Sequence, residues 1–293
     1  MESHCERNSN CYMLRKILLD LIFLLIVGFL VLVFFLWGVP YERGFFWDDR
    51  SLKLPFKDST VTSAMLYSIG FTLPLVTMLI TEYLRLRNYQ GQSRAIFDVE
   101  IPAWIWETYR VVGIFLFGCA CQQLATGIGK YSIGGLRPHF FDVCNPDVNC
   151  TLPENIGRYI DSYTCLGDNS RRLRQMRLSF PSGHASFSSY TMVFLALYLQ
   201  KRVSWHGSKV LRHFLQFVVI MMAWYTGMSR VSDNKHHWGD VIAGFIIGAG
   251  AAVLAIVFLY KPTKVELCYS CLTESTNRQD TMLRNLHLAR DQY

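Results

Sequence analysis

The sequence predicts an all-α, polytopic integral membrane protein with six transmembrane helices. Of its 293 residues, 51% are hydrophobic and only 17% are charged, whereas soluble domains carry roughly 25% charged residues. The apolar residues gather in runs of about 20, the length that a helix needs to cross a bilayer. The net charge of +7 lies between these runs rather than on one soluble face, so the chain is not expected to bind nucleic acid.

The apolar runs, taken in chain order, define the expected helices. The first run is longer than a signal-peptide core of roughly 7–15 residues and has no small-residue cleavage site after it, so it is expected to stay as an anchor. The fourth run is shorter and more polar than the others. The six predicted spans are residues 17–37, 61–81, 111–129, 185–200, 214–228 and 241–260. They form a membrane domain over residues 17–260, between tails at 1–16 and 261–293.

The orientation follows from a glycosylation motif rather than from charge, because basic residues are shared almost evenly between the two sides. The triplet Asn149-Cys150-Thr151 is an N-glycosylation acceptor, which is used only outside the cytosol. The connection 130–184 is therefore expected to be a large outer loop, and the connection 229–240 lies on the same side. Both tails are then cytosolic.

A first polar cluster follows the third predicted span. Gly134 and Gly135 permit backbone conformations closed to other residues, and Pro138 fixes the exit of the chain. This turn can bring Lys130 and Arg137 toward one point. Taken singly, each of these cations reads more simply as an interfacial anchor.

A second polar cluster, Pro181-Ser182-Gly183-His184, precedes the fourth span. Ser182 can cap that helix, and the free amides at its start suit an anion. Alone, Ser182 would be only a cap and His184 only a hydrogen-bonded histidine.

A third polar cluster joins the fifth span to the sixth. It holds Arg230 and, further on, His236 and Asp240, which are four residues apart and would share one face of a helical turn. The adjacent His237 should point about 100° away, which favours a structural or lipid-facing role.

The parity of six spans places all three clusters at the same membrane face, where they can converge. Together they supply three cations, helix-start amides, two histidines and one carboxylate. Such a set can bind a phosphate dianion and transfer it to a histidine.

These residues resemble the signature of the type 2 phosphatidic acid phosphatase superfamily. The matching segments are Lys130-x6-Arg137-Pro138, Pro181-Ser182-Gly183-His184 and Ser229-Arg230-x5-His236-x3-Asp240. The flanks, including Arg43-Gly-Phe-Phe-Trp-Asp-Asp, look like those of the animal lipid phosphate phosphatases in particular. The resemblance covers about residues 15–262.

The resemblance implies a magnesium-independent phosphatidate phosphatase with no cofactor and no metal ligands. His236 would be the nucleophile that forms a phosphohistidine, Asp240 would orient it, and His184 would act as general acid and then base. The residues that would bind the phosphate are Lys130, Arg137, Ser182, Gly183 and Arg230.

The implied substrates are phosphatidic acid, lysophosphatidic acid, sphingosine 1-phosphate and ceramide 1-phosphate, with roles in phospholipid metabolism and lipid signalling. The expected location is the plasma membrane with an extracellular site; the ER or Golgi with a luminal site is the alternative.

The sequence leaves two alternatives to a lipid phosphate phosphatase. A superfamily member acting on a polyprenyl diphosphate, a sugar phosphate or a lipid-to-lipid transfer would keep the signature, but the animal-type flanks argue against it. A non-enzymatic relative would typically lack part of the signature, and here every part is present.

Several features lie beyond the signature. Cys144, Cys150 and Cys165 in the outer loop allow one disulfide and leave one thiol over. Gly244-x3-Gly248 permits close helix contact, within the chain or between the subunits of a homo-oligomer. Cys119 and Cys121 are expected to be packing residues. Candidate palmitoylation sites are Cys5, Cys11, Cys268 and Cys271.

A basic stretch runs from Arg171 to Arg177. It is either a solvated loop or a segment that draws acidic lipids to the site.

Overall fold

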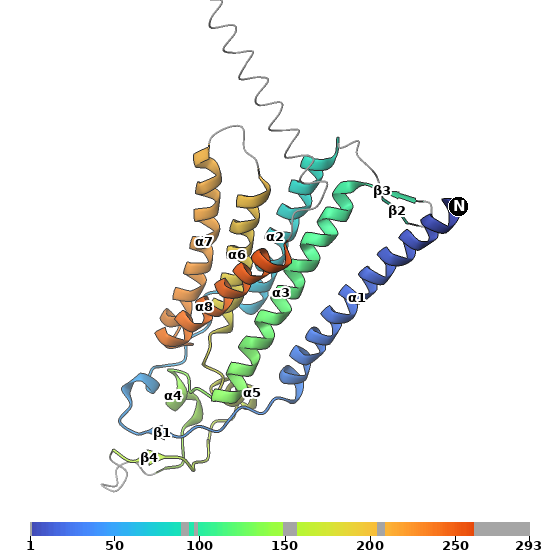
Figure 1. Cartoon of the computed structure of the whole chain (residues 1–293). Coiled ribbons are helices and arrows are strands. Elements are labelled where there is room, and N and C mark those ends of the chain that lie inside the picture. The colour runs from blue at the N-terminus through green and yellow to red at the C-terminus, as the bar shows by residue number, and fades with distance from the viewer. Residues whose placement is uncertain (1, 89–93, 97–98, 149–156, 204–208, 261–293) are drawn as a thin grey trace, which may run out of the picture.

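The computed structural model describes residues 2–88, 94–96, 99–148, 157–203 and 209–260, and this part of the chain is mostly helical (Figure 1). The helices are α1 (Glu2–Trp37), α2 (Ser63–Leu86), α3 (Ala103–Ile133), α4 (Phe140–Cys144), α5 (Ser170–Gln175), α6 (Gly183–Arg202), α7 (Lys209–Ser232) and α8 (Trp238–Leu254), which a π-helical turn, η3 (Ala255–Leu259), continues. A 3-10 turn, η1 (Arg50–Leu52), and two short antiparallel pairs complete the fold: β1 (Phe45–Phe46) with β4 (Tyr159–Ile160), and β2 (Arg94–Ile96) with β3 (Val99–Ile101).

Five helices in the described part of the chain are long and apolar enough to cross a bilayer, so the protein is an integral membrane protein. They are Met13–Trp37, Ser63–Leu86, Ala103–Ile133, Val210–Ser232 and Trp238–Leu259. Each covers all or nearly all of one predicted apolar run and extends beyond it at one end or both, because polar residues continue the helix past the apolar stretch. The second helix begins at Ser63 rather than at residue 61, and the last ends at Leu259 rather than at residue 260. The residues expected as an N-terminal tail continue α1, which begins at Glu2.

The fourth predicted run forms α6, a 20-residue helix that does not reach the apolarity of the other five. It lies at the centre of the bundle and packs against α2, α3, α7 and α8. Its hydroxyl groups are satisfied by the protein: Tyr190 donates to the Phe115 carbonyl at 2.7 Å, and Thr191 donates to the Phe187 carbonyl at 3.1 Å. A helix surrounded by other helices does not need an apolar face toward lipid.

Close contact between α6 and α8 depends on two glycines of α8. A Cβ atom on Gly244 would lie 2.6 Å from the Ser182 carbonyl oxygen, and one on Gly248 would overlap the Ser186 carbonyl oxygen. Small residues let two helix backbones approach in this way. Of the two uses expected for this glycine pair, the structure shows the contact within the chain.

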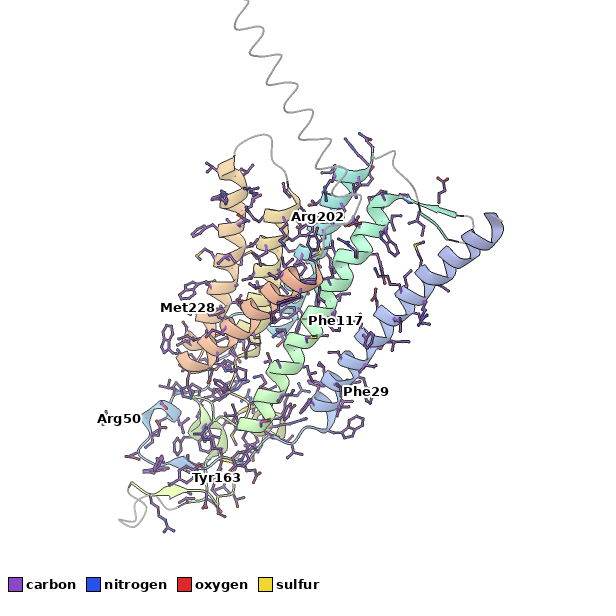
Figure 2. The ribbon with its side chains drawn as sticks, in the orientation of Figure 1. Phe29, Arg50, Phe117, Tyr163, Arg202 and Met228 are labelled. Atoms are coloured by element: carbon purple, nitrogen blue, oxygen red, sulfur yellow. A yellow bond between two sulfur atoms is a disulfide. The ribbon has the colours of Figure 1, made fainter. Side chains whose placement is uncertain are left out.

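The end of the bundle away from the connections that follow α1 and α3 is tied by buried ion pairs. Arg202 at the end of α6 contacts Glu82 of α2 and Glu107 of α3, each at 2.9 Å, and Tyr198 donates to Glu82 at 2.9 Å. Figure 2 shows Arg202 at the opposite end of the molecule from Tyr163, which lies among the loops. Paired charges make this burial tolerable.

The connections after α1 and α3 fold together into a small separate core at the other end (Figure 1). Strand β1 from the first connection pairs with β4 from the second, and a disulfide joins Cys144 to Cys165. Cys150 and the expected glycosylation site Asn149 lie outside the described residues. The buried members of this core are Phe45, Leu52, Leu136, Phe140, Cys144, Ile160 and Met176.

Candidate active site

The first cluster begins where α3 ends. Gly134 adopts a left-handed conformation with φ of 57°, and a Cβ atom there would overlap the Tyr41 carbonyl. This residue must therefore be glycine for the chain to turn here. Lys130, in the last turn of α3, donates to the Leu178 carbonyl at 2.9 Å, which aims its ammonium group at the segment leading into α6.

Arg137 follows this turn and has its backbone amide bonded to the Met176 carbonyl at 2.9 Å. Its guanidinium Nε is buried and has no hydrogen-bond partner in the described part of the chain. Burial lowers the pKa of Arg137 to about 10; the neighbouring Arg230 also lowers this pKa, and Asp240 opposes both effects. The guanidinium stays charged at neutral pH and has capacity to bind an anion.

The second cluster forms the start of α6. Ser182 is the N-cap: its hydroxyl accepts from the Ala185 amide at 3.4 Å, and its own amide donates to the Asp240 carbonyl at 2.9 Å. Gly183 lies against Lys130, because a Cβ atom on this glycine would be 3.5 Å from Lys130 Cε. The end of α3 and the start of α6 therefore meet at one point.

His184 is in the first turn of α6. Its Nε2 atom is buried without a hydrogen-bond partner among the described residues, while the ring bonds to the backbone of Val61. Lys130, Arg137 and Arg230 are all close enough to act electrostatically on this imidazole. His184 thus faces the same space as the three cations.

The third cluster lies between α7 and α8, and here the expectation of a shared helical turn was wrong. Helix α8 begins at Trp238 with His237 as its N-cap, so His236 precedes the helix. His236 and Asp240 nevertheless meet: the imidazole Nδ1 is 3.6 Å from Asp240 Oδ2. The extended backbone of His237, with ψ of 159°, turns His236 back over the first turn of α8.

Asp240 is held firmly in this position. Its Oδ2 atom accepts from the His237 amide at 3.0 Å and from the Ser179 hydroxyl. The carboxylate therefore links the entry to α6 with the entry to α8. A cavity of about 400 Å³ between the connections that follow α1 and α3 reaches this carboxylate.

The imidazole of His236 is 3% exposed. Burial lowers its pKa well below the usual value; Asp240 opposes this shift, and the neighbouring Arg137 and Lys130 add to it. The ring is therefore neutral at physiological pH. A neutral imidazole is the form that can act as a nucleophile.

Of the structural and lipid-facing roles expected for His237, the structure shows the structural one. Its Nε2 atom donates to the Leu136 carbonyl at 3.1 Å. This bond ties the start of α8 to the first cluster, next to Arg137.

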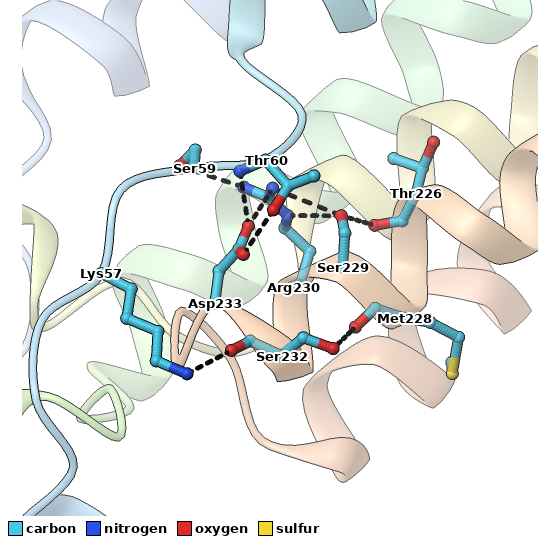
Figure 3. A network of polar contacts seen from close by, with 9 residues as sticks. All are labelled: Lys57, Ser59, Thr60, Thr226, Met228, Ser229, Arg230, Ser232 and Asp233. Carbon is cyan, nitrogen blue, oxygen red and sulfur yellow. Dashed lines mark hydrogen bonds and ion pairs between the residues drawn. The ribbon is translucent and has the colours of Figure 1, made fainter.

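Arg230 is 2% exposed and is fixed by a network of polar contacts (Figure 3). Its guanidinium donates to Asp233 at 2.8 Å and to the Ser59 hydroxyl at 3.3 Å. Asp233 also accepts from the amide and hydroxyl of Thr60, at 2.8 and 2.7 Å. The connection before α2 therefore holds Arg230 in place.

Sequence reasoning missed this connection and two basic residues beside it. Phe56 lies 3.4 Å beneath the ammonium of Lys235, whose pKa falls to about 8 because of burial and the neighbouring Arg137 and Arg230. His139 donates to the Asn234 carbonyl at 2.7 Å, and burial lowers its pKa to about 4, so it is a neutral support for the loop. No spacing rule links residues 55–60 to a loop more than 170 positions away.

The three clusters thus meet at one end of the bundle, around a neutral imidazole with a carboxylate at its Nδ1 side. The sequence profile of the PAP2 superfamily matches residues 111–264, which include all three clusters. Relatives are similar over most of the chain. A Drosophila melanogaster protein named "Putative phosphatidate phosphatase" is 50% identical over 84% of this chain and 69% of its own length.

The chain belongs to the PAP2 superfamily. Phospholipid phosphatase 1 of Rattus norvegicus is 39% identical over 91% of this chain and 95% of its own, and phospholipid phosphatase 2 of Homo sapiens is 36% identical over 88% and 87%. No solved structure matches this chain. The PAP2 match begins within α3, so α1, α2 and the connection that holds Arg230 precede it.

Proposed function

We propose that this PAP2 protein is a lipid phosphate phosphatase that hydrolyses phosphatidic acid, lysophosphatidic acid, sphingosine 1-phosphate and ceramide 1-phosphate. The products are the dephosphorylated lipid, such as diacylglycerol, and inorganic phosphate. The single observation that carries the proposal is the meeting of Lys130, Arg137 and Arg230 around His184 and the His236–Asp240 pair. The names of the relatives favour a phosphorylated lipid as the substrate.

In the first step, the three cations bind the phosphate oxygens, helped by the hydroxyl of Ser182 and the amide of Gly183. Asp240 keeps the proton of His236 on Nδ1, so that the Nε2 lone pair attacks phosphorus. The bound phosphate dianion offsets the three cations and favours the imidazolium form of His184. The P–O bond to the lipid breaks, and this imidazolium gives a proton to the departing alkoxide oxygen. The lipid alcohol leaves, and the phosphoryl group is on His236.

In the second step, His184 takes a proton from a water molecule, and the resulting hydroxide attacks phosphorus. The P–N bond breaks, inorganic phosphate leaves, and His236 recovers its neutral form. The cations stabilise the charge on the equatorial oxygens in both steps.

The donor set supports a reaction that needs no magnesium and no other cofactor. Cations occupy the positions from which a metal would otherwise neutralise phosphate charge. The carboxylate of Asp240 is engaged by Ser179 and the His237 amide. Activity in the presence of a chelator is the expected result.

We infer six transmembrane spans: the five apolar helices and α6, which is the fourth in chain order. The β1–β4 pair joins the connection after α1 to the one after α3, so these two connections lie on the same side, as alternating spans require. A disulfide in the second connection favours an oxidising compartment. These features support an extracellular or luminal site and cytosolic tails.

The plasma membrane is the proposed location, with the ER or Golgi as the alternative, and the protein would act in phospholipid metabolism and lipid signalling. We also propose that the protein forms a homo-oligomer. Gly244 and Gly248 contact α6 within the same chain, so they do not support this proposal.

The test is phosphate release by the purified protein from the four lipid phosphates, compared with glucose 6-phosphate and a polyprenyl diphosphate. The lipid phosphates are expected to be hydrolysed, and His236→Ala is expected to lose at least about 10³-fold in kcat. Activity on the last two substrates alone, or full activity of His236→Ala, would overturn the proposal.

A further inference from the structure

A groove of about 410 Å³ lies between α2 and α7, and residues of α6 form its floor. Its walls are largely apolar, with side chains that include Met65, Ile69, Val218, Met221 and Met222. A volume of this size is typical of a small-molecule site.

The polar residues in the floor do not present unsatisfied groups to the groove. Ser188 and Thr191 are 3% and 0% exposed, and their hydroxyls donate to carbonyls of their own helix, at 3.3 Å to Ala185 and 3.1 Å to Phe187. An apolar ligand can therefore lie on this floor without leaving a buried hydrogen-bonding group unpaired.

The groove ends next to the proposed phosphate site. Val61 lines the groove, and its backbone bonds to the imidazole of His184. Thr226 also lines it, and its carbonyl accepts from the Ser229 hydroxyl at 2.8 Å, which in turn accepts from the guanidinium of Arg230. Two residues that contact the proposed phosphate site therefore lie at the end of an apolar groove.

The groove runs from this end toward the middle of the membrane. Its α7 wall extends from Thr226 back to Phe217, which at 1.5 Å per residue is about 13 Å of helix. Cations at one end and an apolar groove at membrane depth match the two parts of a lipid phosphate.

We propose that the groove between α2 and α7 binds the hydrocarbon chain of the lipid whose phosphate is attacked by His236. This rests on the lipid phosphatase activity proposed above and names where the chain lies. Because the bilayer is as apolar as the groove, burial gives little affinity, and the gain is in orientation of the phosphate toward His236. The flexible thioethers of Met65, Met192, Met221 and Met222 allow the groove to accommodate chains of different shape.

The kinetic test fills the groove with Met221→Trp, because Met221 is 38% exposed and can be enlarged without entering the core. Leu215→Trp is the matched control: this residue is also on α7, is 41% exposed and is not part of the groove. The ratio of kcat/KM for dioleoyl phosphatidic acid to that for para-nitrophenyl phosphate is the readout. We expect this ratio to fall about tenfold in Met221→Trp and to stay unchanged in Leu215→Trp. An unchanged ratio in Met221→Trp, or an equal fall in both variants, would overturn the groove assignment.

A labelling experiment tests occupancy without relying on turnover. The His236→Ala protein is exposed in vesicles to phosphatidic acid or to phosphatidylcholine, each with a photoreactive group in the same acyl chain. We expect phosphatidic acid to label Met65 and Met221 more strongly than phosphatidylcholine does. Equal labelling by both lipids would show a groove filled by bulk lipid and would refute the assignment. If the wild type releases phosphate from lipids and labelling is equal, the groove assignment alone fails; absence of lipid hydrolysis by the wild type would instead reject the proposed function.

Discussion

At the scale of single residues, one carboxylate organises the site. Asp240 accepts from Ser179 and from the His237 amide, lies 3.6 Å from His236, and its carbonyl accepts from Ser182. The residue types and spacings of the clusters were enough to predict His184, His236 and Asp240 as candidates. The geometry of the pair was not predictable, because it depends on the extended backbone of His237 rather than on a helical turn.

Lys235 gives a pH-dependent prediction at this scale. Its pKa is lowered to about 8 by burial and by Arg137 and Arg230, so its positive charge is present below pH 8 and is lost as the pH rises through that value. If this charge helps to bind phosphate, kcat/KM falls above about pH 8. Lys235→Arg should move this alkaline limb to higher pH, because an arginine keeps its proton.

The control for this prediction is Lys235→Met, which removes the charge at every pH. It should lower kcat/KM about tenfold at pH 7 and abolish the component of the limb near pH 8. Identical pH profiles of kcat/KM for wild type and both variants would show that Lys235 only supports the loop through Phe56.

At the scale of elements, the apolar runs predicted which segments are helices but not how they pack. The polar character of α6 comes from its place at the centre, where hydroxyls bond to neighbouring helices. The connection before α2, including Ser59 and Thr60, holds Arg230 and Asp233. It carries no recognisable motif, and its partners lie more than 170 residues away, so only the folded chain reveals its role.

The contact of α8 with α6 predicts different outcomes for two glycines of the same helix. A methyl group on Gly248 would overlap the Ser186 carbonyl and lie 2.8 Å from the Tyr190 amide, whereas one on Gly250 would meet nothing within 4 Å. Gly248→Ala should therefore destabilise the protein by about 2 kcal/mol or more, with a lower Tm and reduced activity.

The matched variant Gly250→Ala should leave the Tm unchanged or slightly raised, since alanine is the better helix former by about 0.5–1 kcal/mol. Thermal unfolding in detergent, followed by intrinsic fluorescence, compares the two. Equal Tm values for both variants would mean that α6 and α8 do not pack as closely as described.

At the scale of the whole molecule, the loops and the three clusters share one end, and the buried ion pairs of Arg202 lie at the other (Figure 2). Helix parity was sufficient to predict that the clusters lie on one face. The pairing of β1 with β4 was not predictable, because two-residue strands have no periodic pattern. Three of the 29 basic residues, Lys130, Arg137 and Arg230, lie in the candidate site.

The proposed orientation predicts a glycan on Asn149. In a eukaryotic expression host, the protein should migrate faster after treatment with an endoglycosidase, and Asn149→Gln should migrate at the treated position without treatment. Thr151→Ser is the control, because it preserves the acceptor motif. A glycan found instead in the tail after residue 260 would reverse the orientation.

The central claim is that phosphate passes through His236. The most direct measurement is rapid mixing of the purified protein with radiolabelled phosphatidic acid, quenching in alkali, and mapping of the bound phosphate by mass spectrometry. We predict an acid-labile, alkali-stable phosphoenzyme with the label on His236. It should be absent from His236→Ala and long-lived in variants of His184, the proposed activator of the water. Label on any other residue, or turnover by His236→Ala at the wild-type rate, would contradict it.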